Sequence, residues 1–266
     1  MNTRIRSILT AALAGTMLFS QGIDVRAEGT KQEAVYVASY YNSVPALPEE
    51  VGGEAVTWPE VNADEFTELY SVAEVTGAYA DGTEITAYVE IVPNDIVYFI
   101  DSGTGEDWKR AMKGTDDEGK ARTLTSLSYQ AVKELAGDDL LNNVSDQAYD
   151  AGEDTWGYGF ETGGNRADPI QSYSNNNTAV EDNSDVTDKY AVGLRASNNT
   201  NFEYYLTLDA GTYTLTTGFH EFFNGNHKRN MKPTITDAED GTAIAEFDEI
   251  KMSNNANSTA APDMIS

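Results

Sequence analysis

The chain has 266 residues, with 44 acidic side chains against 17 basic ones and a formal net charge of −27. Such a negative field repels nucleic acid and anionic membranes and disfavours anionic polysaccharides, so a neutral partner is expected. The chain has no cysteine, which excludes disulfides and thiolate metal sites.

The N-terminus predicts a secretory signal peptide over residues 1–27. A basic start, MNTRIRS, precedes the apolar run ILTAALAGTMLFS and a small-residue cleavage pattern that ends at Ala27. The apolar run is too short to span a bilayer. We therefore expect an exported protein, secreted or held at the bacterial cell surface, that does not insert into the membrane. A polar linker follows over residues 28–34.

Residues 35–93 predict a first unit made of β-strands. The segments AVTWPEV, ELYSVAEVTGAYA and TEITAYVEIVP are rich in strand-forming residues, and VGGE and ADGT have turn chemistry. In TAYVEIV apolar and polar side chains alternate, which is typical of a strand with one buried face.

A second β-rich unit is predicted over residues 94–252. One helix is expected at Leu124–Leu135, with Leu124, Leu127, Ala131 and Leu135 on one side. Short strands between long polar loops favour a jelly-roll-like sandwich. The tail, residues 253–266, has no strand pattern and is expected to be disordered, which leaves this sandwich without its last strands. The expected strands are Ile96–Asp101, Trp156–Phe160, Tyr190–Arg195, Phe202–Leu208, Thr212–His220, Pro233–Thr236 and Ala243–Ile250.

Motifs for catalysis or metal binding are weak. GTDDEGKA, Gly114–Ala121, is close to a phosphate-binding loop, but Ala121 replaces the hydroxyl that would hold magnesium, and the acidic residues would repel phosphate. His220 and His227 lack helical metal-ligand spacing, so a solvated histidine is favoured over zinc. Calcium stays open for the acidic loops DSGTGED and EDNSDVTD, although neither has EF-hand spacing. No other cofactor is expected, and no carboxylate pair can be singled out for glycoside hydrolysis.

Aromatic side chains near the loops are the candidate sugar-stacking residues. Trp156 lies in DTWGYGF, with little apolar sequence nearby to bury it, so we expect an exposed ring there. Tyr158, Tyr173 and Phe222 also lie near loops. In YTLTTGFHEFF the alternation places Phe219 on the core face and His220 on the other. Core packing is the alternative for each of these rings.

Residues 35–93 resemble a bacterial immunoglobulin-like domain. The likeness rests on LPEEV, VTWPEV and GAYADGTEITAYVEIVP and on their order. It implies a spacer in which Trp58 lies in the core.

Residues 96–250 contain, in this order, the segments IVYFIDSG, LLNNVSDQAYDAGEDTWGYGF, KYAVGLR, FEYYLTLDAGTYTLTTGFHEFF and KRNM. In these segments the chain resembles the malectin-like and galactose-binding-like carbohydrate modules of secreted bacterial glycosidases. The resemblance implies a non-catalytic jelly roll that binds neutral sugars. By position it assigns Trp156, Tyr158, Phe222 and Asp101 to the site, with Glu221 and Arg229 as structural residues.

The expected fold is therefore all-β, with a small immunoglobulin-like sandwich followed by a jelly-roll-like β-sandwich. The expected function is that of a secreted non-catalytic carbohydrate-binding accessory protein. Its partners would be a neutral polysaccharide or oligosaccharide and a neighbouring glycosidase domain. Two alternatives stay open, namely the N-terminal fragment of a multidomain glycoside hydrolase and a surface adhesion or structural protein. The predicted carbohydrate-binding residues are Trp156, Tyr158, Phe222, Asp101, Tyr173 and His220.

Overall fold

The structure is a computed structural model whose described part is mainly β-strand, which confirms the predicted β-rich class. The predicted signal peptide lies outside the described residues. Within the described ranges no helix has the length and hydrophobicity to cross a membrane. The structure describes residues 33–105, 108–110, 120–122, 124–153, 155–160, 165–167, 185–186, 189, 192–195, 201–219, 230–251 and 263–265.

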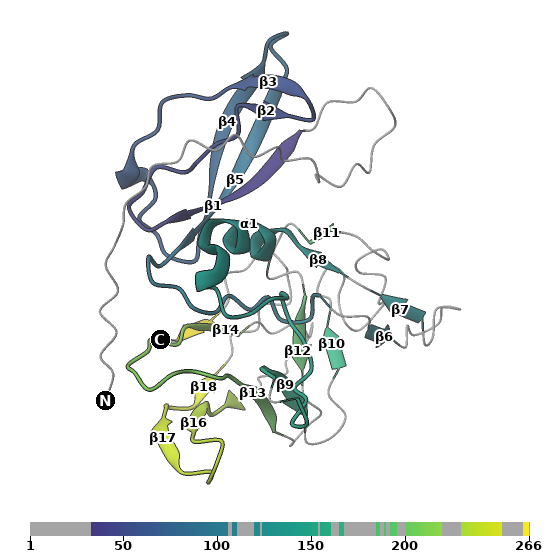
Figure 1. The fold of residues 1–266 in the computed structure, drawn as a ribbon, viewed down its shortest axis with the longest axis vertical. Coiled ribbons are helices and arrows are strands. Elements are labelled where there is room, and N and C mark those ends of the chain that lie inside the picture. Colours follow the sequence, from purple (N-terminus) through teal and green to yellow (C-terminus); the bar gives the residue numbers. More distant parts are fainter. Residues whose placement is uncertain are drawn as a thin grey trace.

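The first unit contains one five-stranded sheet in the order β1-β5-β4-β3-β2 (Figure 1). Strand β1 runs parallel to β5, and the other neighbours are antiparallel. The predicted strands are present as β3, β4 and β5, whereas the immunoglobulin-like assignment stays a prediction. The elements are β1 (Ala34–Tyr40), β2 (Glu50–Val51), β3 (Glu54–Thr57), the short 3-10 helix η1 (Ala63–Glu65), β4 (Val72–Tyr79) and β5 (Glu84–Val92).

One face of β5 carries the core of this sheet. Trp58 packs against that core, and its Nε1 donates a hydrogen bond of 2.7 Å to the Pro48 carbonyl. Gly77 lies under the indole ring, where a Cβ would be 2.5 Å from Trp58 Cε3, so this position requires glycine. The core residues on β5, each at most 1 % exposed, are Ile85, Ala87, Val89 and Ile91.

The predicted helix is present as α1 (Leu127–Ala136), followed by the 3-10 turn η2 (Gly137–Asp139). It begins after Ser126, whose side chain accepts a hydrogen bond from the Tyr129 N–H and caps the helix. It ends at Gly137, which adopts φ 57°. Of the residues predicted to share its apolar side, Ala131 is buried, Leu127 and Leu135 are half-buried, and Leu124 is buried but precedes the helix. The full buried set is Ser128, Tyr129, Ala131, Val132 and Ala136.

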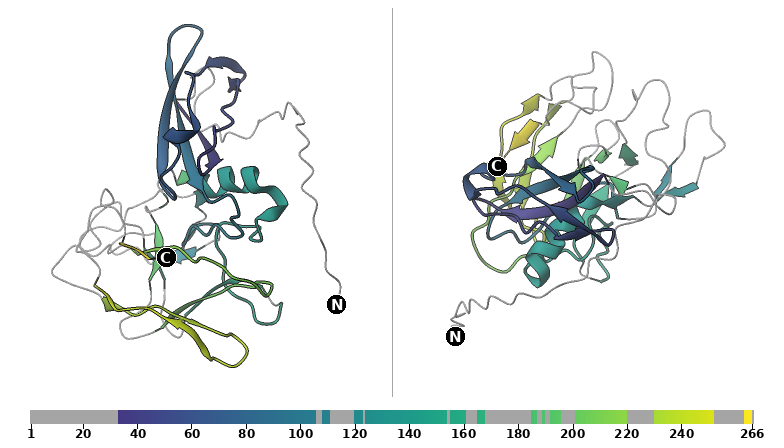
Figure 2. Two further views of the ribbon diagram at one scale, coloured as in Figure 1. Left: turned by 90° about the vertical axis from the view of Figure 1, so that its left-hand side faces the viewer. Right: turned by 90° about the horizontal axis from the view of Figure 1, so that it is seen from above.

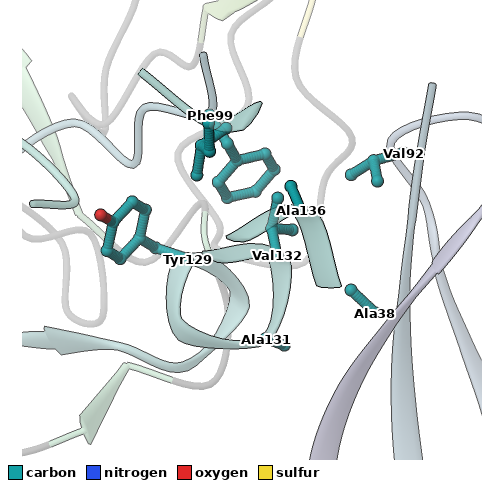
Figure 3. Packing of buried hydrophobic residues seen from close by; sticks show 8 residues of the cluster. Ala38, Val92, Phe99, Tyr129, Ala131, Val132 and Ala136 are labelled. Carbon is teal, nitrogen blue, oxygen red and sulfur yellow. The ribbon is translucent and has the colours of Figure 1, made fainter. Parts of the chain in front are cut away.

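Helix α1 packs on the outer face of β1 and β5, and the two units share a core there (Figures 1 and 3). Figure 3 shows Ala38 and Val92, from the first sheet, beside Val132 and Ala136 of the helix. We call this cluster the junction core. Its members are Ala38, Val92, Phe99, Tyr129, Ala131, Val132, Ala136 and Leu140.

The second unit is described as a set of two-stranded ladders, so the jelly-roll assignment stays a prediction. The hairpin of β16 and β17 lies at the opposite end of the molecule from the first sheet (Figure 2). The ladders join β6 (Trp108–Arg110) to β7 (Lys120–Arg122), β8 (Thr125–Ser126) to β11 (Asp185–Val186), β9 (Gly157–Phe160) to β13 (Phe202–Tyr205), β10 (Asn165–Ala167) to β12 (Gly193–Arg195), β14 (Thr217–Phe219) to β19 (Asp263–Ile265), β15 (Asn230–Met231) to β18 (Ile250–Lys251), and β16 (Thr234–Thr236) to β17 (Ala243–Glu246).

Several of the strand predictions need correction. Within the expected strand Thr212–His220 residues 212–216 form no strand, and β13 and β17 end at Tyr205 and Glu246, short of the expected ends. Residues 96–101 form no strand, because the Asn142 side chain takes the place of a partner strand: its Oδ1 accepts from the Phe99 N–H at 3.1 Å and its Nδ2 donates to the Phe99 carbonyl at 2.6 Å. The tail was expected to contain no strand, but β19 pairs with β14. The N–H and C=O groups at the edge of a sheet can pair with another strand whatever its side chains are, and β19 is that strand for β14.

Candidate functional site

The predicted binding residues that the structure describes are all buried. Trp156, Tyr158 and Asp101 are 6 %, 7 % and 3 % exposed. The prediction that Trp156 offers an exposed ring to a sugar is therefore wrong. The other predicted residues lie outside the described part of the chain, and these are Phe222, Tyr173 and His220, together with Glu221 and Arg229.

Rings from distant parts of the sequence cover Trp156 and Tyr158. Tyr98 meets Trp156 edge to face, with the ring centroids 5.8 Å apart. Tyr204 of β13 meets Tyr158 in the same way at 6.3 Å. Such contacts bury a large apolar area and have a favourable aromatic geometry. Trp156 and Tyr158 thus belong to the core of the second unit.

Asp101 lies in a buried polar cluster and supports the start of helix α1. The Ser126 hydroxyl donates to Asp101 Oδ2 at 2.5 Å while its oxygen accepts from the Tyr129 N–H at 3.0 Å. A carboxylate near the first turn also interacts favourably with the helix dipole. The Asp101 backbone is held as well, since its N–H donates to the Ser145 carbonyl at 3.0 Å. Asp101 therefore has a structural role.

Asp146 is the second carboxylate of this cluster, and it is 0 % exposed. It accepts hydrogen bonds from the Gly103 N–H at 2.6 Å, the Gln147 N–H at 3.0 Å and the Tyr204 hydroxyl at 2.9 Å. Burial raises the pKa of Asp146 to about 8, and the nearby charge of Asp101 adds to the increase, while the hydrogen bonds oppose it. Three separate segments of the second unit therefore meet at one carboxyl group.

The Asp146 cluster continues through Tyr204 to Ser102, whose hydroxyl groups are 2.8 Å apart. Burial, together with the Asp146 charge, holds the pKa of Tyr204 well above its usual value. The two carboxyl groups are at most 3 % exposed and are therefore closed to a ligand, whereas Ser102 and Tyr204 are only half-buried. No sequence pattern singles out Asp146, since one aspartate in a polar segment resembles any loop residue.

A different set of aromatic rings faces outward from the β9–β13 ladder. In this ladder Tyr204 pairs with Tyr158, and Tyr205 pairs with Gly157. Since alternate strand residues point to opposite faces, Tyr205 and Glu203 lie on the face opposite Tyr204. The Tyr149 N–H donates to the Tyr158 carbonyl at 2.9 Å, which brings a third segment beside β9.

On this outward face Tyr149 stacks on Tyr205, with ring centroids 4.0 Å apart and an interplanar angle of 15°. Both rings are half-buried, and Glu203 is exposed. The Tyr205 hydroxyl donates to Glu203 Oε2 at 2.6 Å, and this bond, together with burial, raises the pKa of Tyr205. Gly159 leaves room for the Tyr205 ring, because a Cβ there would be 3.2 Å from Tyr205 Cε2. We call Tyr149, Tyr205 and Glu203 the tyrosine face.

A polar turn borders the tyrosine face. The Asp150 N–H donates to Thr155 Oγ1 at 2.9 Å, and Asp150 Oδ1 accepts from the Gly152 N–H at 2.8 Å. These bonds fix the turn directly after Tyr149 and leave the Asp150 side chain exposed. The face thus combines a partly open aromatic surface with carboxylate and hydroxyl groups.

Within the described ranges, no group of three or more His, Asp or Glu side chains lies close enough together to hold a metal ion. Calcium in the loop DSGTGED is not favoured by the described part of that loop, because Asp101 points into the buried cluster. No protein-family model matches the chain, and no match was found among the curated proteins or the solved structures. The chemistry of the tyrosine face is therefore the main guide to function.

Proposed function

We propose that this chain is an exported, non-catalytic carbohydrate-binding accessory protein that binds a neutral saccharide on the tyrosine face. The observation that carries the proposal is the half-buried pair of stacked rings, Tyr149 and Tyr205, beside the exposed Glu203. The proposed site therefore does not include Trp156 and Tyr158, which were predicted from the sequence. The sequence likeness to carbohydrate modules and the signal-peptide pattern support the same function.

The tyrosine face has the groups that a sugar needs. The C–H face of a pyranose that lies on an aromatic ring removes about 60–80 Å² of mainly apolar surface from water, which contributes about 1.5–2 kcal/mol. The Glu203 carboxylate can accept hydrogen bonds from sugar hydroxyl groups, and the Tyr205 hydroxyl lies 2.6 Å from it. One such site gives roughly millimolar affinity. That affinity suffices when a tethered glycosidase or a polymeric ligand raises the effective concentration.

The charge of the chain favours a neutral ligand, because a net charge of −27 repels uronic acids and sulfated sugars. Binding without bond cleavage agrees with the positions of Asp101 and Asp146. These carboxyl groups accept hydrogen bonds from protein donors and are at most 3 % exposed. A glycosidase needs two carboxyl groups that flank a bound sugar.

Affinity electrophoresis in gels that contain neutral polysaccharides tests this function. The parent chain should be retarded by at least one polysaccharide, and Tyr205→Ala should lose most of that retardation. Tyr88→Ala is a matched control, since Tyr88 also stacks on a tyrosine, Tyr36, at 5.0 Å, but in the first unit. The control should be retarded like the parent.

Two outcomes would contradict the proposal in different ways. Equal retardation of Tyr205→Ala and the parent would remove the tyrosine face from the binding site. No retardation of the parent by any neutral polysaccharide would reject carbohydrate binding. The adhesive alternative would then gain support from the apolar side chains Leu208, Tyr213 and Leu215, which are 37 %, 45 % and 45 % exposed, because exposed apolar groups suit a protein partner.

A further inference from the structure

The connection between the two units is short and packed. Strand β5 ends at Val92, a residue of the junction core, and Ile96 already packs against the same core. Pro93 lies between them and has a restricted backbone, and its carbonyl accepts a bond of 3.4 Å from the Ile96 N–H. This geometry differs from that of a flexible linker, in which few contacts cross the boundary.

Beside the junction core lies a buried ion pair that joins the two units. Glu90 is on β5 and points to the same outer face as Val92, and its side chain is 2 % exposed. Lys189 belongs to the second unit, and its side chain is 11 % exposed. The Lys189 ammonium pairs with Glu90 Oε1 and also donates to the Tyr70 carbonyl at 2.5 Å. Both acceptors belong to the first unit.

These contacts favour a single orientation of the second unit relative to the first. Burial raises the pKa of Glu90, and the charge of Lys189 together with Ser128 of α1 lowers it. A buried carboxylate that loses its cation is strongly destabilising, whereas an exposed pair contributes little. Any rotation of the second unit that withdrew Lys189 would leave the buried Glu90 carboxylate without its cation.

We infer that Lys189 locks the second unit onto the outer face of the first sheet, so that residues 33–93 form a rigid support and not a flexible spacer. The resemblance implied a spacer, and the contacts across the junction core argue against a spacer that moves independently of the second unit. The inference does not depend on sugar binding. Its consequence is that any ligand site on the second unit has a fixed direction relative to the N-terminal unit.

Distance measurements between spin labels test this inference on the full chain. Because the chain has no cysteine, Thr83→Cys and Asp209→Cys introduce two labels at exposed positions, one in each unit. Electron–electron double resonance should give one narrow distance distribution. In the same labelled chain Lys189→Ala should broaden the distribution several-fold and lower the melting midpoint by about 6–15 °C. Lys232→Ala, which removes a pair that is 58 % exposed on both sides, should change neither.

A broad distribution in the labelled parent would overturn the inference. So would a Lys189→Ala chain that keeps both the narrow distribution and the parent midpoint. If Lys189→Ala fails to fold, the double variant Glu90→Gln/Lys189→Met removes both charges and avoids an unpaired buried carboxylate. It should fold and show a broader distribution than the parent, and a distribution as narrow as that of the parent would exclude Lys189 as the lock.

Discussion

A tryptophan in a polar segment is buried here because its neighbours come from elsewhere in the chain. Trp156 contacts Tyr98 edge to face, and its carbonyl accepts from Gln147 Nε2 at 2.7 Å. We therefore predict that Trp156→Ala lowers the free energy of unfolding by about 3–5 kcal/mol, since it opens a large cavity. Urea denaturation measures this loss. The control Tyr41→Ala, at a ring that is 42 % exposed, should change stability by less than about 0.5 kcal/mol.

An outcome in which Trp156→Ala costs less than about 1 kcal/mol and abolishes polysaccharide retardation would contradict this reading. It would show that the Trp156 ring contributes more to ligand binding than to the stability of the core. The sequence provides Trp156 and its polar neighbours, but burial depends on Tyr98, which is far away in the chain. For this reason the exposure predicted for Trp156 was wrong.

Asp146 should make stability depend on pH. Its pKa is about 8 in the folded chain, above the ordinary value of 3.8, so the folded state holds a proton that the unfolded state has lost between these values. Stability should therefore fall as pH rises from about 4 to 8, by at most about 1.4 kcal/mol per pH unit. Asp146→Asn should flatten the slope of the melting midpoint between pH 5 and 8.

The exposed Asp150→Asn is the matched control for Asp146→Asn, and it should keep the parent slope. The comparison of slopes matters more than absolute stability, because an asparagine amide cannot accept all the hydrogen bonds that Asp146 accepts. Identical slopes for the parent and Asp146→Asn would mean that Asp146 is ionised in the folded chain throughout this range. The three donated hydrogen bonds would then outweigh its burial.

At the scale of elements, local patterns were sufficient where one face of an element is buried. The alternation in TEITAYVEIVP predicted β5, and apolar spacing predicted helix α1. The helix begins at Leu127, later than predicted, because the hydroxyl of the preceding Ser126 caps the first turn and donates to Asp101. Local patterns were less informative for segments whose structure depends on a partner far away in the sequence. Residues 96–101 have the composition of a strand, but their backbone is hydrogen-bonded by the Asn142 side chain.

The tyrosine face illustrates the same limit at the candidate site. Tyr149 and Tyr205 meet because β9 and β13 pair in one register and the segment of Tyr149 lies beside Tyr158. A shift of one residue in that register would send Tyr205 into the core and Tyr204 to the outside. The sequence shows both tyrosines but does not show the register. The residues of the face could therefore be found only from the structure.

For the whole molecule, the net charge lowers the stability of the folded state and the packing of the core raises it. The net charge of −27 places many like charges on a chain whose units share the junction core, and their repulsion favours expansion. Burial of the core and the Glu90–Lys189 pair oppose it. Salt screens exposed charges much more strongly than buried pairs. Added salt should therefore change the balance between charge repulsion and core packing without any mutation.

We predict that the melting midpoint rises by about 3–8 °C when sodium chloride increases from roughly 0.01 M to 1 M, as the Debye length falls from about 30 Å to about 3 Å. Weakening of the exposed Lys232–Glu246 pair has the opposite sign, but such pairs contribute little. Choline chloride should give the same rise, since screening does not depend on which monovalent cation is present. A midpoint that falls with salt would mean that surface ion pairs stabilise this chain more than its excess of negative charge destabilises it.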